Sequence, residues 1–315
     1  MMNTRSQNTT PFHDKLTGML FGLAAGDALG TTLEFTARDS NPPLTDIVGG
    51  GPFGLPPGAW TDDTSMALCL GESLIACKGF DPADQMRRYL RWHSEGHLSS
   101  TGRCFDIGIT TLRSLQKFEA LNEPYAGSTD PYSAGNGSIM RLAPVVMYFH
   151  GQGEEVCRRY AAESSRTTHG APECLDGCEL MASALWHLAS GSSREKMLVT
   201  LGKISLRSTG RLTDLQQGGF TQKSRAEIKG SGYVVDSLEA ALWCLFTTDS
   251  FKDAVLMAAN LGDDADTTAA VCGQLAGAFY GKSAIPGSWL AKLALPQTLD
   301  SIATGLVQGG SERPE

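Results

Sequence analysis

Long apolar runs, an excess of basic residues and zinc-type cysteine spacings are all missing from this sequence. The most apolar early run, Leu20 to Ala25, is short and is soon followed by Asp27, whereas a membrane-spanning helix needs about 20 apolar residues. The N-terminal stretch MMNTRSQNTTPFHDK is polar and has no apolar core, so it does not resemble a signal peptide. We therefore expect a cytoplasmic protein without a membrane segment.

Basic residues are the minority among the charged residues. The 315-residue chain has 26 Lys and Arg against 34 Asp and Glu, a formal net charge of −8. Nucleic-acid-binding proteins usually present a basic face, so nucleic-acid binding is not expected. Hydrophobic residues make up 41% of the chain and charged residues 19%, which is typical of a globular protein rather than a disordered one.

The eight cysteines do not form a zinc motif. Cys174 and Cys178 are four residues apart, which would place both thiols on one helical face, but no second Cys or His pair has zinc-ligand spacing. The better interpretation is free thiols in a reducing compartment.

Strand patterns are also absent, because almost every periodic segment repeats near 3.6 residues. We expect helices over residues 13–30, 64–78, 82–96, 104–120, 137–150, 153–165, 173–190, 194–206, 233–247, 251–261 and 266–281. This pattern predicts an all-α fold, a single compact multi-helix domain. We place the domain at residues 13–307, between flexible tails at 1–12 and 308–315.

Glycine and proline mark particular places in these helices. Gly18, Gly22, Gly26 and Gly30 are each four residues apart, so another helix or a ligand is expected very close to that face. The segment 137–150 is apolar nearly all round, which indicates a helix in the middle of the core, and Pro144 should end or kink it. Segments 35–60 and 207–232 are rich in Gly, Pro or polar residues and are expected to be loops.

Two acidic clusters stand where an expected loop passes into an expected helix. They read Trp60-Thr61-Asp62-Asp63-Thr64 and Gly262-Asp263-Asp264-Ala265-Asp266-Thr267-Thr268. Helix capping would explain either cluster alone, since Asp and Thr are favoured caps. Capping needs one oxygen, however, and crowded carboxylates raise each other's pKa unless a cation holds them. Carboxylates and hydroxyls without Cys or His favour Mg²⁺ or Mn²⁺ over zinc.

Glu34, in GDALGTTLEF, is a further carboxylate that could join both clusters. Without these six acids, 28 acidic residues face 26 basic ones and the net charge is −2. Most of the negative charge would then belong to one site, and two divalent cations would largely neutralise it.

Seven stretches together resemble the ADP-ribosylglycohydrolase family, particularly its bacterial dinitrogenase reductase-activating branch. In the family's order they are GLAAGDALGTTLEF, WTDDTSMAL, GNGSIMRLAP, TTH, GYVVDSLEAALW, NLGDDADTTAAVCGQLAGAFYG and IPGSWL, over roughly residues 16–293. The pair of TDD and GxDxDT, about 200 residues apart, is highly specific, whereas the single glycine motifs are not.

The resemblance implies an all-helical fold with two metal ions, usually Mg²⁺ or Mn²⁺. It places the metal ligands at Thr61, Asp62, Asp63, Asp264, Asp266 and Thr267, with Glu34 beside them. It places the ADP-ribose contacts at Gly135, Asn136, Gly137, Ser138, His169 and Tyr233. Glycines let backbone N–H groups approach a diphosphate, and a following helix N-terminus would favour the anion. Tyr233 could equally be a half-buried core residue, and His169 a surface residue at a helix end.

One segment, HLSSTGRCFDIG, departs from the family pattern. Where the activating glycohydrolases have an aspartate, the closest match is Ser99, and Asp106 lies on the other side of the motif. The departure argues against a mechanism in which this aspartate assists opening of the ribose ring. It also weakens the assignment of an arginine-linked substrate.

The resemblance predicts a hydrolase that cleaves the N-glycosidic bond between ADP-ribose and a protein side chain, most simply arginine. Glu34 and Asp63 are the expected catalytic acid/base residues. The expected partners are an ADP-ribosylated protein and ADP-ribose, and a monomer is expected. The alternatives are cleavage of ADP-ribose from serine, nucleic acid or a small metabolite, or a catalytically silent ADP-ribose-binding protein.

Overall fold

Helices form nearly all the regular structure of the computed structural model, which describes residues 10–311. Between Thr10 and Ser311 there are fourteen α-helices and five short 3₁₀ segments. Instead of β-strands, this part of the chain has only isolated β-bridges, for example between Gly135 and Tyr233. The predicted all-α fold is therefore confirmed.

The helices follow one another as listed here. They are α1 (Pro11–Gly30), α2 (Asp62–Cys77), α3 (Pro82–Glu95), α4 (Ile109–Leu121), α5 (Ala143–Phe149), α6 (Glu154–Arg166), α7 (Pro172–Ala189), α8 (Arg194–Leu201), α9 (Arg211–Gln216), α10 (Val234–Thr247), α11 (Phe251–Ala259), α12 (Ala265–Tyr280), α13 (Gly287–Leu290) and α14 (Pro296–Ser311).

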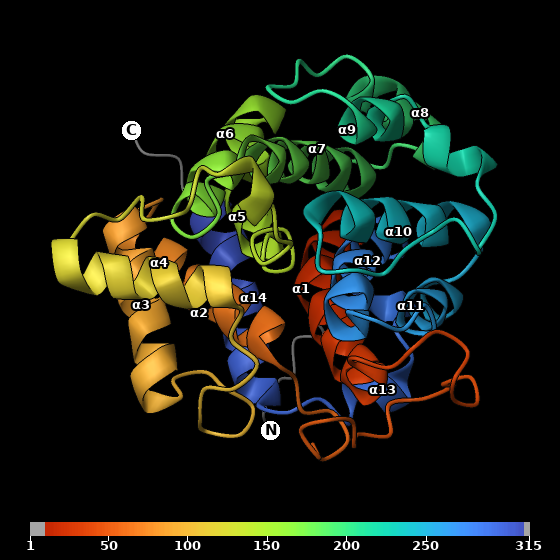
Figure 1. Cartoon of the computed structure of the whole chain (residues 1–315), viewed down its shortest axis with the longest axis horizontal. Helices are drawn as coiled ribbons and strands as arrows, with labels where there is room; N and C mark the ends of the chain where they lie inside the picture. Colours follow the sequence, from red (N-terminus) through yellow and green to blue (C-terminus); the bar gives the residue numbers. More distant parts are fainter. Residues whose placement is uncertain (1–9, 312–315) are drawn as a thin grey trace, which may run out of the picture.

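Helices α1 and α12 pack against each other at the centre of the molecule (Figure 1). The glycine stripe of α1 faces this partner, and a Cβ at Gly22 or Gly26 would overlap the backbone carbonyl oxygens of Gly273 or Ala269. The two backbones therefore approach as closely as glycine allows. The prediction of a helix very close to this face is confirmed.

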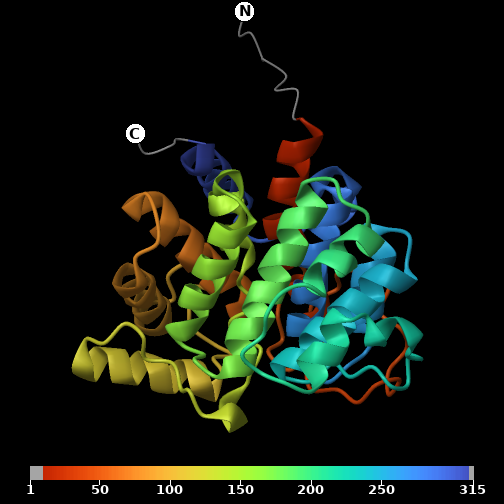
Figure 2. The ribbon, with the colours of Figure 1, turned by 90° about the horizontal axis from the view of Figure 1, so that it is seen from above.

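The remaining helices surround this central pair. Helices α2, α3 and α4 lie on one side of α1 and α12, whereas α10, α11 and α13 lie on the other (Figures 1 and 2). Helix α7 packs on α6, α10 and α12, and α14 packs on α2 and α5. The segment Pro11–Leu33 is long and apolar enough to span a membrane, but 89% of its most apolar 18-residue window, whose mean hydropathy is 1.2, is buried inside the fold, as is typical of a core helix.

Several sequence-predicted boundaries were wrong. Helix α4 begins at Ile109 rather than residue 104, and residues 137–141 form turns, so the long helix expected over 137–150 is reduced to α5. Pro144 opens α5 instead of ending or kinking it, because proline is well accommodated in the first helical turn. The expected loop at 207–232 contains α9.

The ends of the chain also differ from expectation. Pro11 and Phe12 belong to α1, and α14 continues to Ser311, so parts of both expected tails are helical. Residues 1–9 and 312–315 of those tails lie outside the described residues.

Candidate active site

A cavity of about 500 Å³ opens where the N-terminal ends of α2, α4 and α12 come together. Six carboxylates line it, together with Asn136 and His169, and none of its lining residues is Lys or Arg. The six are Glu34, Asp62, Asp106, Asp263, Asp264 and Asp266. The two acidic clusters therefore do meet, over 200 residues apart in sequence.

Both clusters begin a helix, yet neither provides the cap of its own helix. The N-cap residues of α2 and α12, Thr61 and Asp264, make no side-chain capping bond. Asp27 of α1 instead accepts hydrogen bonds from the backbone N–H groups of Thr61 and Thr64, at 2.8 and 3.0 Å. Capping alone therefore does not explain the carboxylates of the cluster at α2.

Glu34 does the same for α12. Its Oε2 accepts from the backbone N–H groups of Ala265 at 3.1 Å and Asp266 at 3.3 Å. Because the caps come from Asp27 and Glu34, the cluster carboxylates Asp62, Asp63 and Asp266 are left for another purpose.

More carboxylate oxygens surround the Thr61 hydroxyl than its one hydrogen can satisfy. The Thr61 hydroxyl oxygen lies 2.9 Å from Asp27 Oδ1, 3.2 Å from Asp63 Oδ2 and 3.1 Å from Asp266 Oδ2. A hydroxyl has one hydrogen to donate, so it can satisfy only one of these three carboxylates. Asp63 Oδ1 is buried and has no hydrogen-bond partner among the described residues.

Burial and mutual repulsion raise the pKa values of these carboxyls. Burial is the largest cause in each case and Asp266 the second for Asp27, Asp264 and Asp106. The pKa rises to about 7 for Asp27 and Asp264 and to about 9 for Asp106. Such a cluster needs protons or cations to be stable at neutral pH.

The donor set fits divalent cations. Carboxylate oxygens of Asp27, Asp63 and Asp266 lie within 4.8 Å of one another, and so do those of Glu34, Asp264 and Asp266. The two groups share Asp266. Oxygen ligands of this kind suit Mg²⁺ or Mn²⁺, and the unpartnered Asp63 Oδ1 is a free ligand atom.

The predicted metal-site residues converge, with two differences in detail. Thr267 donates to Asp63 Oδ2 at 3.3 Å, so its hydroxyl lies among the clustered carboxylates. Asp62 lines the cavity but belongs to neither carboxylate group. Asp27 belongs to one of the two groups, although it was not among the metal ligands expected from the sequence. The signal that could have identified Asp27 is that it is the one carboxylate in the apolar, glycine-striped part of α1 after its first turn.

Ser99 does not occupy the position inferred for it. It is absent from the cavity lining, and its hydroxyl donates to the backbone carbonyl of Arg103 at 2.6 Å. Asp106 lies in the lining instead, at a positive φ of 61°. The site therefore has a carboxylate from this segment, and the apparent loss of an aspartate at Ser99 is wrong.

The glycine segment expected to contact ADP-ribose forms one wall of the cavity. Gly135, Asn136 and Gly137 line it, and Asn136 Nδ2 donates to Asp264 Oδ2 at 2.7 Å. Ser138 is buried behind the wall beside Cys178, whose thiol lies 3.4 Å from its hydroxyl. Tyr233 is outside the lining, although it pairs with Gly135 through an isolated β-bridge.

The helix N-terminus beside this wall is not the expected one. No helix follows Ser138 directly, since α5 begins only at Ala143. Helix α4 takes that place, because its first three residues, Ile109, Thr110 and Thr111, line the cavity. Its N-cap is Gly108, which has no side chain to cap the helix. The leading N–H groups of a helix have no partners within it, and they favour an anion.

His169 is buried in the same wall, so the alternative of a surface histidine was wrong. Its exposed fraction is 3%, and burial together with nearby Arg141 lowers its pKa to about 3. The imidazole is therefore neutral at physiological pH.

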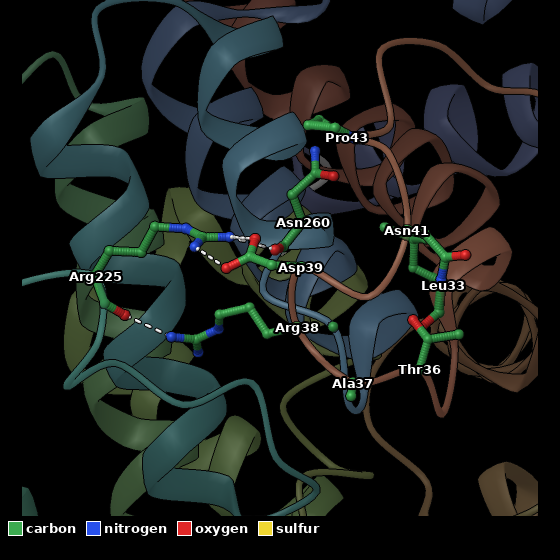
Figure 3. A pocket seen from close by; sticks show the side chains of 10 residues that line it. Leu33, Thr36, Ala37, Arg38, Asp39, Asn41, Pro43, Arg225 and Asn260 are labelled. Carbon is green, nitrogen blue, oxygen red and sulfur yellow. Dashed lines mark hydrogen bonds and ion pairs between the residues drawn. The ribbon is translucent and has the colours of Figure 1, made fainter.

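A second, smaller cavity of about 130 Å³ lies where the segment after Glu34 is fastened to the rest of the fold (Figure 3). Arg225 forms a two-pronged ion pair with Asp39, at 2.7 and 2.8 Å, and Arg38 donates to the carbonyl of Arg225 at 2.6 Å. Closer to the site, the backbone of Phe35 donates to the carbonyl of Asp263 at 2.8 Å. These contacts hold Glu34 against the start of α12.

A fold built only from helices, with a carboxylate-lined cavity at the ends of three of them, defines the class of protein to which this chain belongs. A family model described as ADP-ribosylglycohydrolase matches residues 8–315. The chain belongs to the ADP-ribosylglycohydrolase family and is an enzyme of that family.

Individual relatives agree with this assignment. The chain is 45% identical over 295 residues to ADP-ribosylarginine hydrolase Tri1 of Serratia proteamaculans, covering 93% of this chain and 79% of that protein. It is 34% identical over 288 residues to ADP-ribosyl-[dinitrogen reductase] glycohydrolase of Rhodospirillum rubrum, covering 89% and 90%. A solved structure of an ADP-ribosylglycohydrolase-related protein complex matches with a TM-score of 0.84 at 41% identity, covering 95% and 99%.

Proposed function

We propose that this protein is a metal-dependent hydrolase of the N-glycosidic bond between ADP-ribose and an arginine side chain of a protein. The observation that carries the proposal is the cavity itself, in which six carboxylates, without Lys or Arg, face a glycine-rich wall and a helix N-terminus. The names of the relatives that hydrolyse ADP-ribosylarginine support the linkage.

Two divalent cations, Mg²⁺ or Mn²⁺, are the proposed cofactors. Asp27, Asp63 and Asp266 would hold one, and Glu34, Asp264 and Asp266 the other. The hydroxyls of Thr61 and Thr267 lie among these carboxylates. When bound, such ions fix the ribose hydroxyls and lower the pKa of a bound water.

The residues of the opposite wall would bind the diphosphate. The amide hydrogen of Gly137, which lines the cavity, makes no hydrogen bond to another described residue, and the N-terminus of α4 lies beside this glycine wall. N–H groups in both places favour an anion. The ribose would then lie toward the carboxylates.

Hydrolysis breaks the bond from the ribose anomeric carbon to nitrogen, joins that carbon to a water oxygen and returns a proton to the leaving nitrogen. Among the six carboxylates that line the cavity, we assign the exchange of this proton to Glu34 and Asp106. Asp63 is fully buried and does not line the cavity, so we now assign it to metal binding rather than to the proton transfer expected from the sequence.

Charge complementarity favours arginine as the attachment site. A guanidinium is always positively charged, and the carboxylates at the cavity would attract it. Serine, nucleic-acid and small-metabolite linkages lack this positive charge. A silent ADP-ribose-binding protein would have no need to retain so many mutually repelling acids.

The test is release of ADP-ribose from two defined substrates, an arginine-modified and a serine-modified protein, each with Mg²⁺, with Mn²⁺ and with EDTA. We expect metal-dependent release from the arginine substrate. Release from the serine substrate alone would contradict the arginine assignment, and full release in EDTA from metal-free protein would contradict the metal assignment.

We also propose a cytoplasmic monomer. All eight cysteines are free thiols, which suits a reducing compartment. Light scattering of the purified chain would test the monomer, and fractionation of the producing cells would test the location.

A further inference from the structure

Arg141 is a guanidinium without an ion-pair partner, buried directly behind the cavity wall. Its exposed fraction is 0%, and no carboxylate between residues 10 and 311 forms an ion pair with it. Two of its nitrogens are committed to the wall: Nη1 donates to the Gly137 carbonyl at 2.8 Å and Nη2 to the Thr168 hydroxyl at 2.7 Å. The guanidinium also lies over the Tyr89 ring, 4.8 Å from its centroid, so this contact and the two hydrogen bonds offset the cost of burying its charge.

The Thr168 hydroxyl links Arg141 to His169. Thr168 is fully buried, and its oxygen lies 2.9 Å from His169 Nδ1. A guanidinium only donates, so Thr168 accepts from Arg141. The only other described partner of this hydroxyl is His169 Nδ1, so its single hydrogen is satisfied only if Thr168 donates to Nδ1.

This chain of donors determines where the proton of His169 lies. When Nδ1 accepts, the proton of a neutral imidazole must be on Nε2. Nε2 has no hydrogen-bond partner among residues 10–311, and its edge of the ring faces the glycine wall: a Cβ at Gly137 would lie 2.7 Å from Cε1 and 3.0 Å from Nε2. The residue lines the cavity, so the Nε2–H is the free donor on that side.

We propose that Arg141 and Thr168 are positioning residues that fix His169 as the neutral tautomer with hydrogen on Nε2, aimed at the bound ligand. The inference deepens the proposed function, because the ligand in question is the diphosphate of ADP-ribose. The other tautomer would present the Nε2 lone pair, which repels a phosphate oxygen. The buried guanidinium also adds positive potential behind an otherwise acidic cavity.

The first test does not depend on ADP-ribose. Nitrogen NMR of the histidine rings distinguishes a protonated from an unprotonated ring nitrogen, and the His169 signals are those lost in His169→Gln. We expect Nε2 protonated and Nδ1 bare in the wild-type protein with Mg²⁺ and in Thr168→Ser, which keeps the hydroxyl. Thr168→Val removes the hydroxyl at nearly the same volume and should give mixed tautomers. A proton on Nδ1 in the wild type, or a Thr168→Val spectrum identical to it, would overturn the proposal.

The second test measures ADP-ribose binding by calorimetry with a matched pair of substitutions. Gln at position 169 places an amide N–H near the position of Nε2, whereas Asn places it near Nδ1. We expect His169→Gln to retain most of the affinity and His169→Asn to lose on the order of tenfold to a hundredfold, as for a hydrogen bond to a charged group. Equal losses would show that Nε2–H does not face the ligand. If wild-type protein does not bind ADP-ribose, the proposed function fails, and the NMR result still decides the tautomer.

Discussion

At the scale of single residues, Asp266 is the centre of the site. It belongs to both carboxylate groups, and after burial its charge is the largest cause of the raised pKa values of Asp27, Asp264 and Asp106. Asp62, one residue from Asp63, lines the cavity but belongs to neither group. Sequence position alone could not separate these roles.

Asp266→Asn should therefore remove more metal than Asp62→Asn. The amide keeps the shape of the side chain but loses the charge that both groups share, so we expect loss of metal at both positions and a fall in kcat of on the order of a hundredfold or more. The measurement is metal content by atomic emission together with turnover. Asp249→Asn, at a side chain that is 99% exposed and lies outside the cavity lining, is the control. Equal metal content in all three variants would contradict the shared-ligand assignment.

Asp106 and Ser99 form a second matched pair. Asp106 faces the cavity and Ser99 does not, so Asp106→Asn should lower kcat by about 10² to 10⁴, the usual effect of losing an acid/base group. Ser99→Ala should leave kcat nearly unchanged. Single-turnover hydrolysis of ADP-ribosylarginine measures both. A larger loss in Ser99→Ala than in Asp106→Asn would favour Ser99, rather than Asp106, as the counterpart of the aspartate in the activating glycohydrolases.

His169 gives the protein a dependence on pH whose sign can be worked out. Its pKa is about 3 in the folded protein against 6.5 ordinarily, so the unfolded chain takes up a proton first as the pH falls. The contribution of His169 to the free energy of unfolding should therefore decrease below about pH 6.5. The carboxyls with raised pKa values contribute with the opposite sign, so the measurement is the difference between wild type and His169→Gln in urea unfolding at pH 7 and pH 5, with wild type losing stability relative to the variant as the pH falls. An equal change in both would show that the histidine does not contribute.

At the scale of helices, the close contact of α1 with α12 sets the positions of the metal ligands. Asp27 lies in α1 and Glu34 follows its end, whereas Asp266 lies in the first turn of α12. A small increase in the separation of these helices would move the two sets of carboxylates apart.

Gly26→Ala tests this dependence. The added Cβ would overlap the carbonyl of Ala269, so we expect destabilisation of about 1–3 kcal/mol, as for overpacking, together with weaker binding of Mg²⁺. Gly287→Ala is the control, because nothing lies within 4 Å of its Cβ position. Urea unfolding and metal titration measure the two effects. Unchanged metal affinity in a destabilised Gly26→Ala variant would show that the close packing of α1 on α12 does not set the positions of the metal ligands.

Helix periodicity predicted most of the fold, and the errors have physical causes. The strongly apolar helices α1, α7, α10 and α12 begin and end within about two residues of the prediction. Helix α14 was not predicted because it contains Gly305, Gly309 and Gly310, which lower intrinsic helix propensity. It forms through packing: Gly305 lies against Ile75, and a Cβ at Gly310 would overlap the carbonyl of Tyr148.

The site was only partly predictable for the same kind of reason. Local motifs identified both acidic clusters, but Asp106 reaches the cavity because residues 104–108 form an irregular segment before α4 instead of the expected helix. Nothing in the sequence near Asp27 shows that it caps a helix 34 residues later.

At the scale of the whole molecule, negative charge is concentrated in one place. Metal-free protein should therefore be less stable than metal-loaded protein, because an ion that binds only the folded state adds about 3 kcal/mol at a hundredfold excess over its Kd. Thermal unfolding in EDTA, Mg²⁺ and Mn²⁺ measures this, with a lower Tm expected in EDTA. An identical Tm in all three would argue against resident cations, and Ca²⁺ serves as a comparison ion.

The central helix pair also has a consequence during synthesis. Helix α12 begins more than two hundred residues after α1 ends, which takes roughly ten seconds or longer at 5–20 residues per second. During that time the ribosome-bound chain carries an apolar helix, with a mean hydropathy of 1.2, that lacks the partner it is shaped to fit. A nascent chain of this protein is therefore a natural client for chaperones that shield exposed apolar segments, and its metal centre can form only after nearly the whole chain has been translated.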